Sequence, residues 1–206
     1  MKIALFGGTG RVGSSFLKHA LNNDHLVKVL VRDPSKIERL NNKIEILAGN
    51  ARDPHFINNT IKDCDAVVSC LSTDGDDTLS YVMPKIAEAM QSEGISRIIT
   101  IGTAGILQAR QNPELYRFQS NESKRTLTRA ANEHLKAYET LKASNLEWTV
   151  VCPTYLPDGE LTMKFRFEAD FLPEGGQQIS AEDTGFFAYQ ILIKNDFICK
   201  RVGIAY

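Results

Sequence analysis

The sequence contains little that would support a disulfide-stabilised, metal-binding or membrane-spanning protein. Its four cysteines lie far apart, form no CxxC pair and have no histidine at metal-ligand spacing. We therefore expect reduced thiols in a cytoplasmic protein without a bound metal. No apolar stretch approaches the roughly 18 residues that a membrane span needs. Because an apolar strand pattern already begins at Lys2, we also expect no signal peptide.

Excess charge of one sign is also lacking, since the formal net charge is −1. This balance gives no electrostatic reason to expect a nucleic acid or an anionic membrane as a partner. Internal repeats and low-complexity tracts are absent as well. With 206 residues, of which 43% are hydrophobic, the chain is long enough to bury the core of a single domain spanning residues 1–206.

Apolar, β-branched runs alternate with helical patterns through the first three quarters of the chain. This alternation predicts right-handed βαβ crossovers, and so an α/β fold with a Rossmann-type, doubly wound parallel sheet. The expected strands are 3–6, 26–31, 44–47, 66–71, 97–101 and 147–151. The expected helices are 12–22, 54–62, 79–92 and 121–143, with a short helical turn at 37–40.

After Pro153 the alternation stops. Residues 154–180 are rich in proline, glycine, phenylalanine and charge, without a clear period. We expect them to form a small irregular C-terminal lobe, or a lid, on the substrate side of the domain. A helix over 181–194, with Ser180 as its cap and Asp183 at the third position, and a strand over 200–205 should then return to the sheet.

Three glycines follow the first expected strand, in the motif GGTGRVG at residues 7–13. Between a strand and a helix, one glycine permits a tight turn, the next lets the backbone approach a pyrophosphate, and the third lets the helix pack closely. The free N–H groups and the positive dipole end of the helix then hold the phosphates. We therefore expect a dinucleotide whose pyrophosphate lies at Gly7, Thr9, Gly10, Arg11, Val12 and Gly13.

The end of the second expected strand bears on which dinucleotide binds. An acidic residue there selects the free ribose 2′-hydroxyl, whereas arginine accommodates a 2′-phosphate. Arg32 comes first at this end, and Ser35 and Lys36 follow it. Asp33 is a competing signal, unless it bonds the turn at Pro34, and the whole segment could be an exposed basic turn. We expect NADP as the cofactor, with NADPH preferred over NADH.

Polar and aromatic residues follow the later strands, where the carboxyl ends of parallel strands meet. Asn50 and Asp53 should lie near the adenine, although Asp53 could equally cap the next helix. Thr103 could reach the substrate or the nicotinamide as a catalytic hydroxyl, or only stabilise its own turn. Residues expected beside the nicotinamide are Leu71, Ser72, Thr73 and Pro153. Aromatic residues expected to stack on a substrate are Tyr155, Tyr116 and Phe165, with Phe118, Phe167 and Phe171 as further candidates.

These residues resemble the short-chain dehydrogenase/reductase superfamily, in its atypical branch of NmrA-like and flavin or biliverdin-IXβ-reductase-like proteins. The matching segments, which together span nearly the whole chain, are GGTGRVG, VLVRDPSK, GNARDP, DAVVSCLS, RIITIGTAGIL and LKASNLEWTVVCPTYL. The resemblance implies binding of NADPH and reduction of flavins, quinones or tetrapyrroles. It also implies that some members bind the nucleotide without turnover.

The superfamily's Tyr-x-x-x-Lys pair, in which the tyrosine acts as general acid, has no counterpart in its usual place. The spacing occurs at Tyr81/Lys85 and Tyr138/Lys142, but one pair is too early and the other lies at the far end of its helix. Tyr138 instead belongs to a stripe expected to pack, formed by Leu127, Ala131, His134, Tyr138 and Leu141.

Reduction of a flavin or quinone needs the two rings to be positioned more than it needs a strong acid. We therefore expect hydride transfer from NADPH to a flat conjugated acceptor. The alternative is a non-catalytic, NADP(H)-sensing NmrA-like regulatory protein. A sugar epimerase or dehydratase is disfavoured, because it depends most on the missing tyrosine.

Overall fold

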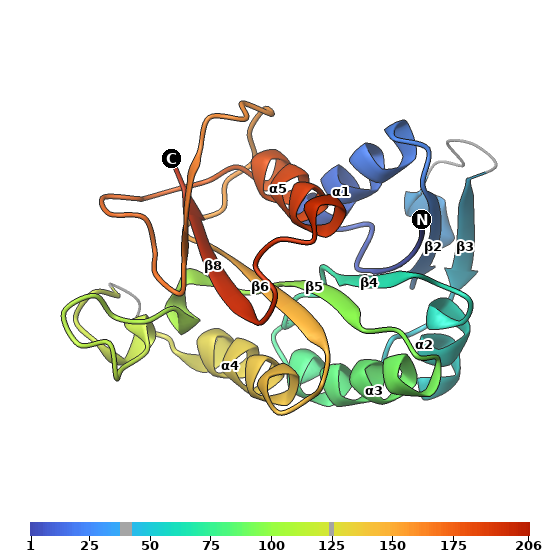
Figure 1. The fold of residues 1–206 in the computed structure, drawn as a ribbon, viewed down its shortest axis with the longest axis horizontal. Helices are drawn as coiled ribbons and strands as arrows, with labels where there is room; N and C mark the ends of the chain where they lie inside the picture. Colours follow the sequence, from blue (N-terminus) through green and yellow to red (C-terminus); the bar gives the residue numbers. More distant parts are fainter. Residues whose placement is uncertain (38–42, 124–125) are drawn as a thin grey trace.

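The computed structural model describes residues 1–37, 43–123 and 126–206. These residues form one eight-stranded sheet in the order β3-β2-β1-β4-β5-β6-β8-β7 (Figure 1). Every neighbouring pair is parallel except β7 with β8. The predicted doubly wound α/β fold is confirmed. The strands are β1 (Lys2–Phe6), β2 (Leu26–Val31), β3 (Ile44–Ala48), β4 (Ala66–Ser69), β5 (Arg97–Ile101), β6 (Glu147–Pro153), β7 (Arg166–Ala169) and β8 (Lys200–Ala205).

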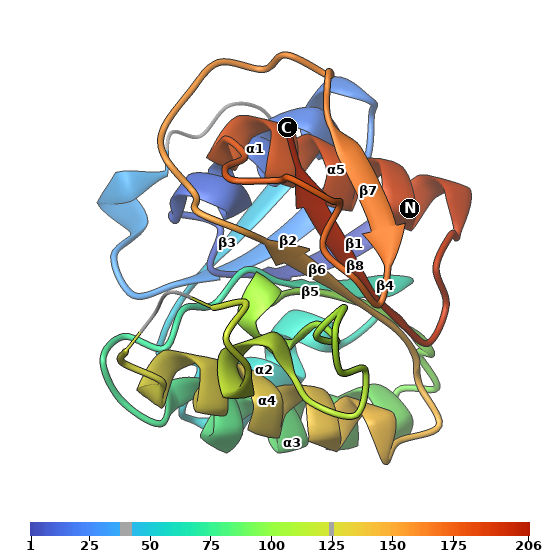
Figure 2. The same cartoon turned by 90° about the vertical axis from the view of Figure 1, so that its left-hand side faces the viewer.

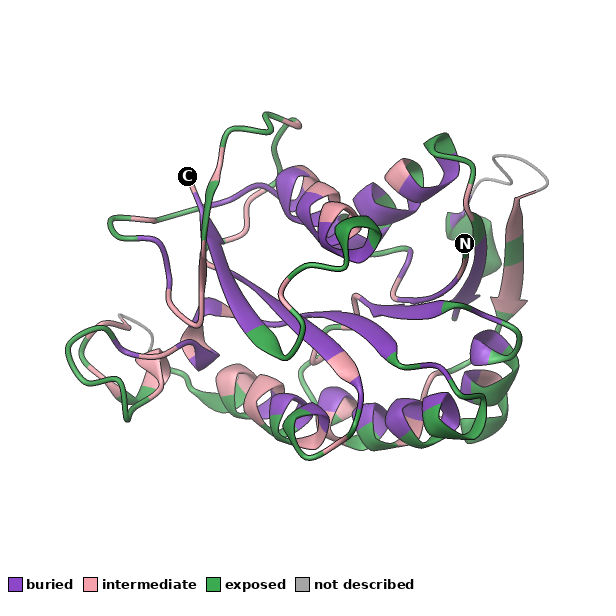
Figure 3. Ribbon diagram, viewed as in Figure 1, coloured by how far each residue is buried: buried purple, intermediate pink, exposed green. Residues whose placement is uncertain are grey.

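Helices cover both faces of the sheet. Figures 1 and 2 show α1 and α5 on one face and α2, α3 and α4 on the other. The central strands between these layers are buried (Figure 3), as expected for parallel strands covered on both sides. No helix in the described ranges is both long and apolar enough to cross a membrane. The helices are α1 (Arg11–Asn22), α2 (Pro54–Ile61), α3 (Thr78–Ser92), α4 (Arg129–Lys142) and α5 (Ala181–Lys194).

The expected helix over 121–143 is wrong at its start, because α4 begins only at Arg129. Before it, the short 3-10 helix η3 (Arg117–Gln119) and an ion pair between Arg117 and Glu122 hold a loop instead. Leu127, expected in the packing stripe, is 86% exposed, whereas Tyr138 and Leu141 are buried as predicted. The helical turn expected at 37–40 falls largely outside the described residues, as do positions 124–125 of the expected helix. The nearest helical turn is η1 (Pro34–Lys36).

The lobe over 154–180 contains a strand that the sequence did not indicate. β7 pairs antiparallel with β8 and forms one edge of the sheet. Four residues are too few for an alternating pattern to stand out. The lobe is therefore partly an extension of the sheet.

Asp183, in the first turn of α5, fastens the lobe to the rest of the structure. Its fully buried carboxylate accepts hydrogen bonds from the backbone N–H groups of Thr162, at 3.0 Å, and Met163, at 2.8 Å. It also accepts from the hydroxyls of Thr162, at 2.7 Å, and Tyr206, at 2.6 Å. Burial alone raises the pKa of this carboxyl, but the hydrogen bonds outweigh it and the pKa lies below its usual value.

We predict that Asp183→Asn loosens the lobe, because the amide cannot accept all of these hydrogen bonds. The free energy of unfolding in urea should fall by about 1–3 kcal/mol at pH 7, and proteases should cleave the 159–165 segment faster. Since the folded pKa is lowered, the carboxylate's stabilisation is complete above about pH 5 and is lost as the pH falls below about 4. The variant and the wild type should therefore converge in stability at acid pH. Glu160→Gln, an exposed carboxylate of the same lobe, is the matched control.

Candidate functional site

The turn between β1 and α1 brings the backbone so close to its surroundings that side chains are excluded. Gly7 has φ +76°, and a Cβ there would lie 2.5 Å from the carbonyl oxygen of Cys70. A Cβ at Gly13 would overlap the carbonyl oxygen of Gly7. Gly10 donates its N–H to that same oxygen at 3.0 Å and forms the N-cap of α1. The first N–H groups of α1 therefore point outward from a turn made of backbone alone.

A cavity of about 480 Å³, here called the glycine-loop cavity, opens beside this turn at the carboxyl ends of β1 to β4. It has the size of a small-molecule site. The structure brings seven of the predicted cofactor-binding residues together in its wall: Gly7, Thr9, Gly10, Arg32, Asn50, Leu71 and Ser72. Residues that the sequence did not indicate also line it, among them Arg52, Asp74 and Asp76.

Other residues predicted to bind the cofactor lie outside this wall. Val12 and Gly13 are buried in α1. The side chain of Arg11 extends to the lobe, where it donates to the carbonyl oxygen of Leu156 at 2.7 Å and approaches Asp158 at 3.2 Å. Val12 and Gly13 therefore contribute to the packing of α1, whereas the side chain of Arg11 links α1 to the lobe.

Three further predicted residues lie just after β2 and β3, and two of them, Asp53 and Ser35, have local roles. Asp53 caps α2 by accepting from the N–H of His55 at 2.9 Å, which is one of the two uses expected for it. Ser35 donates from both its N–H and its hydroxyl to Asp33, and these bonds lower the pKa of the Asp33 carboxyl. Lys36 is exposed at the end of η1.

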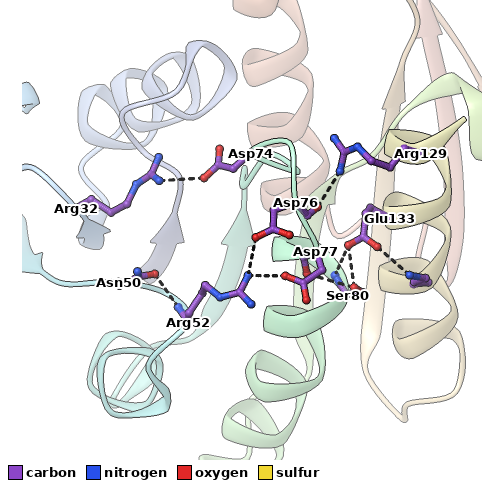
Figure 4. A network of polar contacts seen from close by, with 10 residues as sticks. Arg32, Asn50, Arg52, Asp74, Asp76, Asp77, Ser80, Arg129 and Glu133 are labelled. Carbon is purple, nitrogen blue, oxygen red and sulfur yellow. Dashed lines mark hydrogen bonds and ion pairs between the residues drawn. The ribbon is translucent and has the colours of Figure 1, made fainter. Parts of the chain in front are cut away.

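Arginines from three different elements hold the loop between β4 and α3 (Figure 4). Arg32, following β2, forms an ion pair with Asp74 at 3.0 Å. Arg52, following β3, pairs with Asp77 at 2.7 Å. Arg129, at the start of α4, donates to the carbonyl oxygen of Asp76 at 3.0 Å and to the hydroxyl of Thr73 at 3.3 Å. The only signal for this loop in the sequence is the acidic run TDGDD at residues 73–77.

A second cavity of about 440 Å³, here called the Thr103 cavity, lies farther along the same edge of the sheet. Thr103 accepts a hydrogen bond from the N–H of Gly105 at 3.4 Å, so its hydroxyl also supports the turn that follows β5. Tyr155, which is 62% exposed, and Phe118 contribute aromatic rings to the wall. The full lining is Thr103, Ala104, Gly105, Arg117, Phe118, Glu122, Ser123, Leu127, Thr128, Ala131, Thr154, Tyr155, Gly176 and Gln177.

Three residues predicted to border the substrate or the nicotinamide, Tyr116, Phe165 and Pro153, do not line the Thr103 cavity. The ring of Tyr116 stacks on Phe118, with centroids 6.2 Å apart, and lies against the guanidinium of Arg201. Phe165 packs edge-on against Phe187 of α5, at 5.5 Å. Pro153 is buried at the end of β6, one residue before the lining begins. Phe118, Leu127 and the Gly176–Gln177 segment take the places that Tyr116 and Phe165 were expected to fill.

Neither Tyr-x-x-x-Lys pair brings a phenol to the Thr103 cavity. Tyr138 is buried and packs edge-on against Trp148 at 5.5 Å, and burial raises its pKa. Tyr81 lies on α3 between the cations of Arg52, at 4.4 Å, and Lys85, at 4.0 Å. Both contacts are structural.

Two cysteines lie near strand ends, Cys70 directly after β4 and Cys152 within β6. Burial raises the pKa of both Cys70 and Cys152 to about 12. Their thiols are therefore protonated at neutral pH and are not nucleophiles.

Comparison with known proteins agrees with this geometry. A protein from Bacteroides thetaiotaomicron assigned as an epimerase is 25% identical, with a TM-score of 0.86 over 100% of this chain and 96% of that one. A protein from Streptococcus pneumoniae TIGR4 assigned as an NADH-flavin reductase is 22% identical, with a TM-score of 0.82 over 100% and 99%. A short-chain dehydrogenase/reductase from Veillonella parvula DSM 2008, in complex with NADP, is 17% identical, with a TM-score of 0.77 over 100% and 94%.

A family model described as NAD(P)H-binding matches residues 7–195, from the glycine turn to the end of α5. The match includes both cavities and the loop that the three arginines hold. The chain therefore belongs to the NAD(P)H-binding family, in agreement with its resemblance to the atypical short-chain dehydrogenases/reductases.

Proposed function

We propose that the protein is an NADPH-dependent reductase that transfers hydride to a flavin, a quinone or a similar flat conjugated acceptor. The observation that carries the proposal is the position of the Thr103 cavity. It opens at the same sheet edge as the glycine-loop cavity, and Phe118 and Tyr155 give it aromatic walls. A flat ring fits between such side chains, which stack on its faces.

The glycine-loop cavity suits a dinucleotide because the crowded turn leaves backbone N–H groups as its inner wall. Gly7 and Gly10 would hold the pyrophosphate, together with the first turn of α1. Arg32, in the wall of the cavity, would contact the 2′-phosphate, and Asn50 would lie at the adenosine end. Lys36, exposed at the end of η1, would add a second positive charge nearby. A bound nicotinamide dinucleotide supplies the hydride, so the protein's residues have only to hold and align the two rings.

The lack of a positioned Tyr/Lys pair favours this class of acceptor. A reduced flavin or quinone takes its proton from water, whereas a ketone needs a general acid beside it. The flavin reductase assignment of the Streptococcus pneumoniae protein supports the same acceptor class. The Bacteroides protein is assigned as an epimerase. Epimerisation of a sugar would depend on a general acid, which the buried Tyr138 does not provide.

We predict that the purified protein oxidises NADPH when FMN, riboflavin or a soluble quinone is added. The absorbance at 340 nm follows the reaction, and a nucleotide sugar serves as the comparison substrate. Tight binding of NADPH without turnover on any of these acceptors would instead support the NADP(H)-sensing regulatory protein. An epimerase or dehydratase returns its hydride and leaves the absorbance at 340 nm unchanged, so the nucleotide sugar is followed by chromatography. Conversion of the nucleotide sugar alone would support one of these two activities.

Arg32→Ala should weaken NADPH binding more than NADH binding, because only NADPH carries the 2′-phosphate. Since Arg32 is largely exposed, we expect a loss of about three- to tenfold in NADPH affinity and little change for NADH. Titration calorimetry measures both constants, and Arg32→Lys, which keeps the charge, should retain part of the difference. An equal loss for both dinucleotides would contradict the assignment.

Thr103→Val should lower kcat with FMN by about fivefold, the effect of losing one hydrogen bond near the reacting rings. The dissociation constant of NADPH should change less than kcat, because Thr103 lies outside the glycine-loop cavity, where the pyrophosphate and the adenosine would bind. Thr103→Ser, which keeps the hydroxyl, should react at the wild-type rate. Unchanged turnover in the valine variant would show that Thr103 acts only as the cap of its turn.

A further inference from the structure

An ion pair forms part of the wall of the glycine-loop cavity. The guanidinium of Arg32 and the carboxylate of Asp74 are 3.0 Å apart, and both residues line the cavity. In Figure 4 the two side chains point toward one another from different elements, the end of β2 and the loop before α3. The group expected to receive a 2′-phosphate therefore already contacts an anion of the protein itself.

The loop holds Asp74 in this place. The hydroxyl of Ser72 donates to the Asp74 carboxylate at 2.6 Å. Asp74 and Gly75 both have a positive φ, +49° and +76°, which turns the chain sharply back. On either side of this turn Arg129 bonds the hydroxyl of Thr73 and the carbonyl oxygen of Asp76. The position of the carboxylate is thus set by its own loop as well as by Arg32.

The formal charges around the end of β2 cancel once Asp74 is counted. Arg32 and Lys36 are cations, whereas Asp33 and Asp74 are anions. Asp33 is turned into η1, where Ser35 bonds it, and so Asp74 is the carboxylate that faces Arg32. A dianionic 2′-phosphate gains less from such a site than from an unopposed arginine.

We infer that Asp74 is a specificity-determining residue that limits the preference for the 2′-phosphorylated dinucleotide. Binding of NADPH would exchange the Asp74 carboxylate for the phosphate at Arg32, and Ser72 would keep the displaced carboxylate nearby. NADH has an uncharged 2′-hydroxyl and leaves the ion pair intact. The inference rests on the cofactor part of the proposed function and is independent of the hydride acceptor.

Asp74→Asn tests this inference with little change in shape. Asparagine tolerates the left-handed backbone and can still accept from Ser72, so the loop should be retained. Titration calorimetry with NADP⁺ and NAD⁺ should show NADP⁺ binding about two- to fivefold more tightly than in the wild type, the range of an exposed ion pair. NAD⁺ affinity should stay the same or fall. Ser72→Ala, which releases the carboxylate from its hydrogen bond, should change the ratio in the same direction.

Two further variants separate the ion pair from general electrostatics. Asp76→Asn removes the same charge from the same loop, where Asp76 lies 4.0 Å from Arg52. It should raise NADP⁺ affinity clearly less than Asp74→Asn does. In an Arg32→Ala background, the effect of Asp74→Asn should shrink to that of Asp76→Asn, because the pair no longer exists.

The outcomes distinguish this inference from the proposed function. Equal effects of Asp74→Asn and Asp76→Asn, or an unchanged ratio of NADP⁺ to NAD⁺ affinity, would overturn the role of Asp74 and leave the proposed reductase standing. Failure of the wild type to bind either dinucleotide would overturn both. Binding without turnover would overturn the reductase alone, since the affinity ratio does not depend on an acceptor.

Discussion

The close approach of the first turn to the end of β4 is the contact on which the rest of the site depends. At Gly7 the backbone lies against the carbonyl of Cys70, and any Cβ would collide with it. β2 lies on one side of β1 in the sheet, and β4 lies on the other side. The connections that follow β1 and β4 therefore lead to opposite sides of the sheet. The glycine-loop cavity is the crevice that this reversal leaves open.

Helix α1 joins that crevice to the lobe. Gly185 of α5 lies so close to α1 that a Cβ there would stand 2.6 Å from the side chain of Ser15, and Ser15 donates to the carbonyl oxygen of Glu182. Arg11, in the first turn of α1, bonds the lobe at Leu156. Helix α1 begins at the glycine-loop cavity, and through Arg11 it also positions the lobe segment that follows Tyr155. One helix, α1, thus contacts both the glycine turn and the lobe that contributes to the Thr103 cavity.

Much of the fold follows from periodicity and could be predicted. The strands Leu26–Val31 and Arg97–Ile101 and the helix Ala181–Lys194 occur at the expected bounds, because each is a continuous pattern with a clear beginning and end. The predictions failed where contacts distant in sequence, and not the local hydrophobic pattern, determine where an element begins. The apolar stripe of α4 continues in the sequence back to Leu127, but the helix begins only at Arg129. Before it, the Arg117–Glu122 ion pair holds the chain in a loop. Phe165 leads into a strand too short to be recognised and packs on α5.

Strand ends could be placed from the sequence, but the partners of the side chains there could not. From the sequence, Arg32 can be interpreted only with its neighbours Asp33, Ser35 and Lys36 at the end of a strand. In the fold it faces Asp74, which reaches it from a loop beyond β4 through two left-handed residues. No periodic pattern encodes such a loop, because Arg52 and Arg129 hold it through contacts distant in sequence. We therefore propose that the preference between the two dinucleotides depends on the Arg32–Asp74 pair, and not on the residue type at the end of β2 alone.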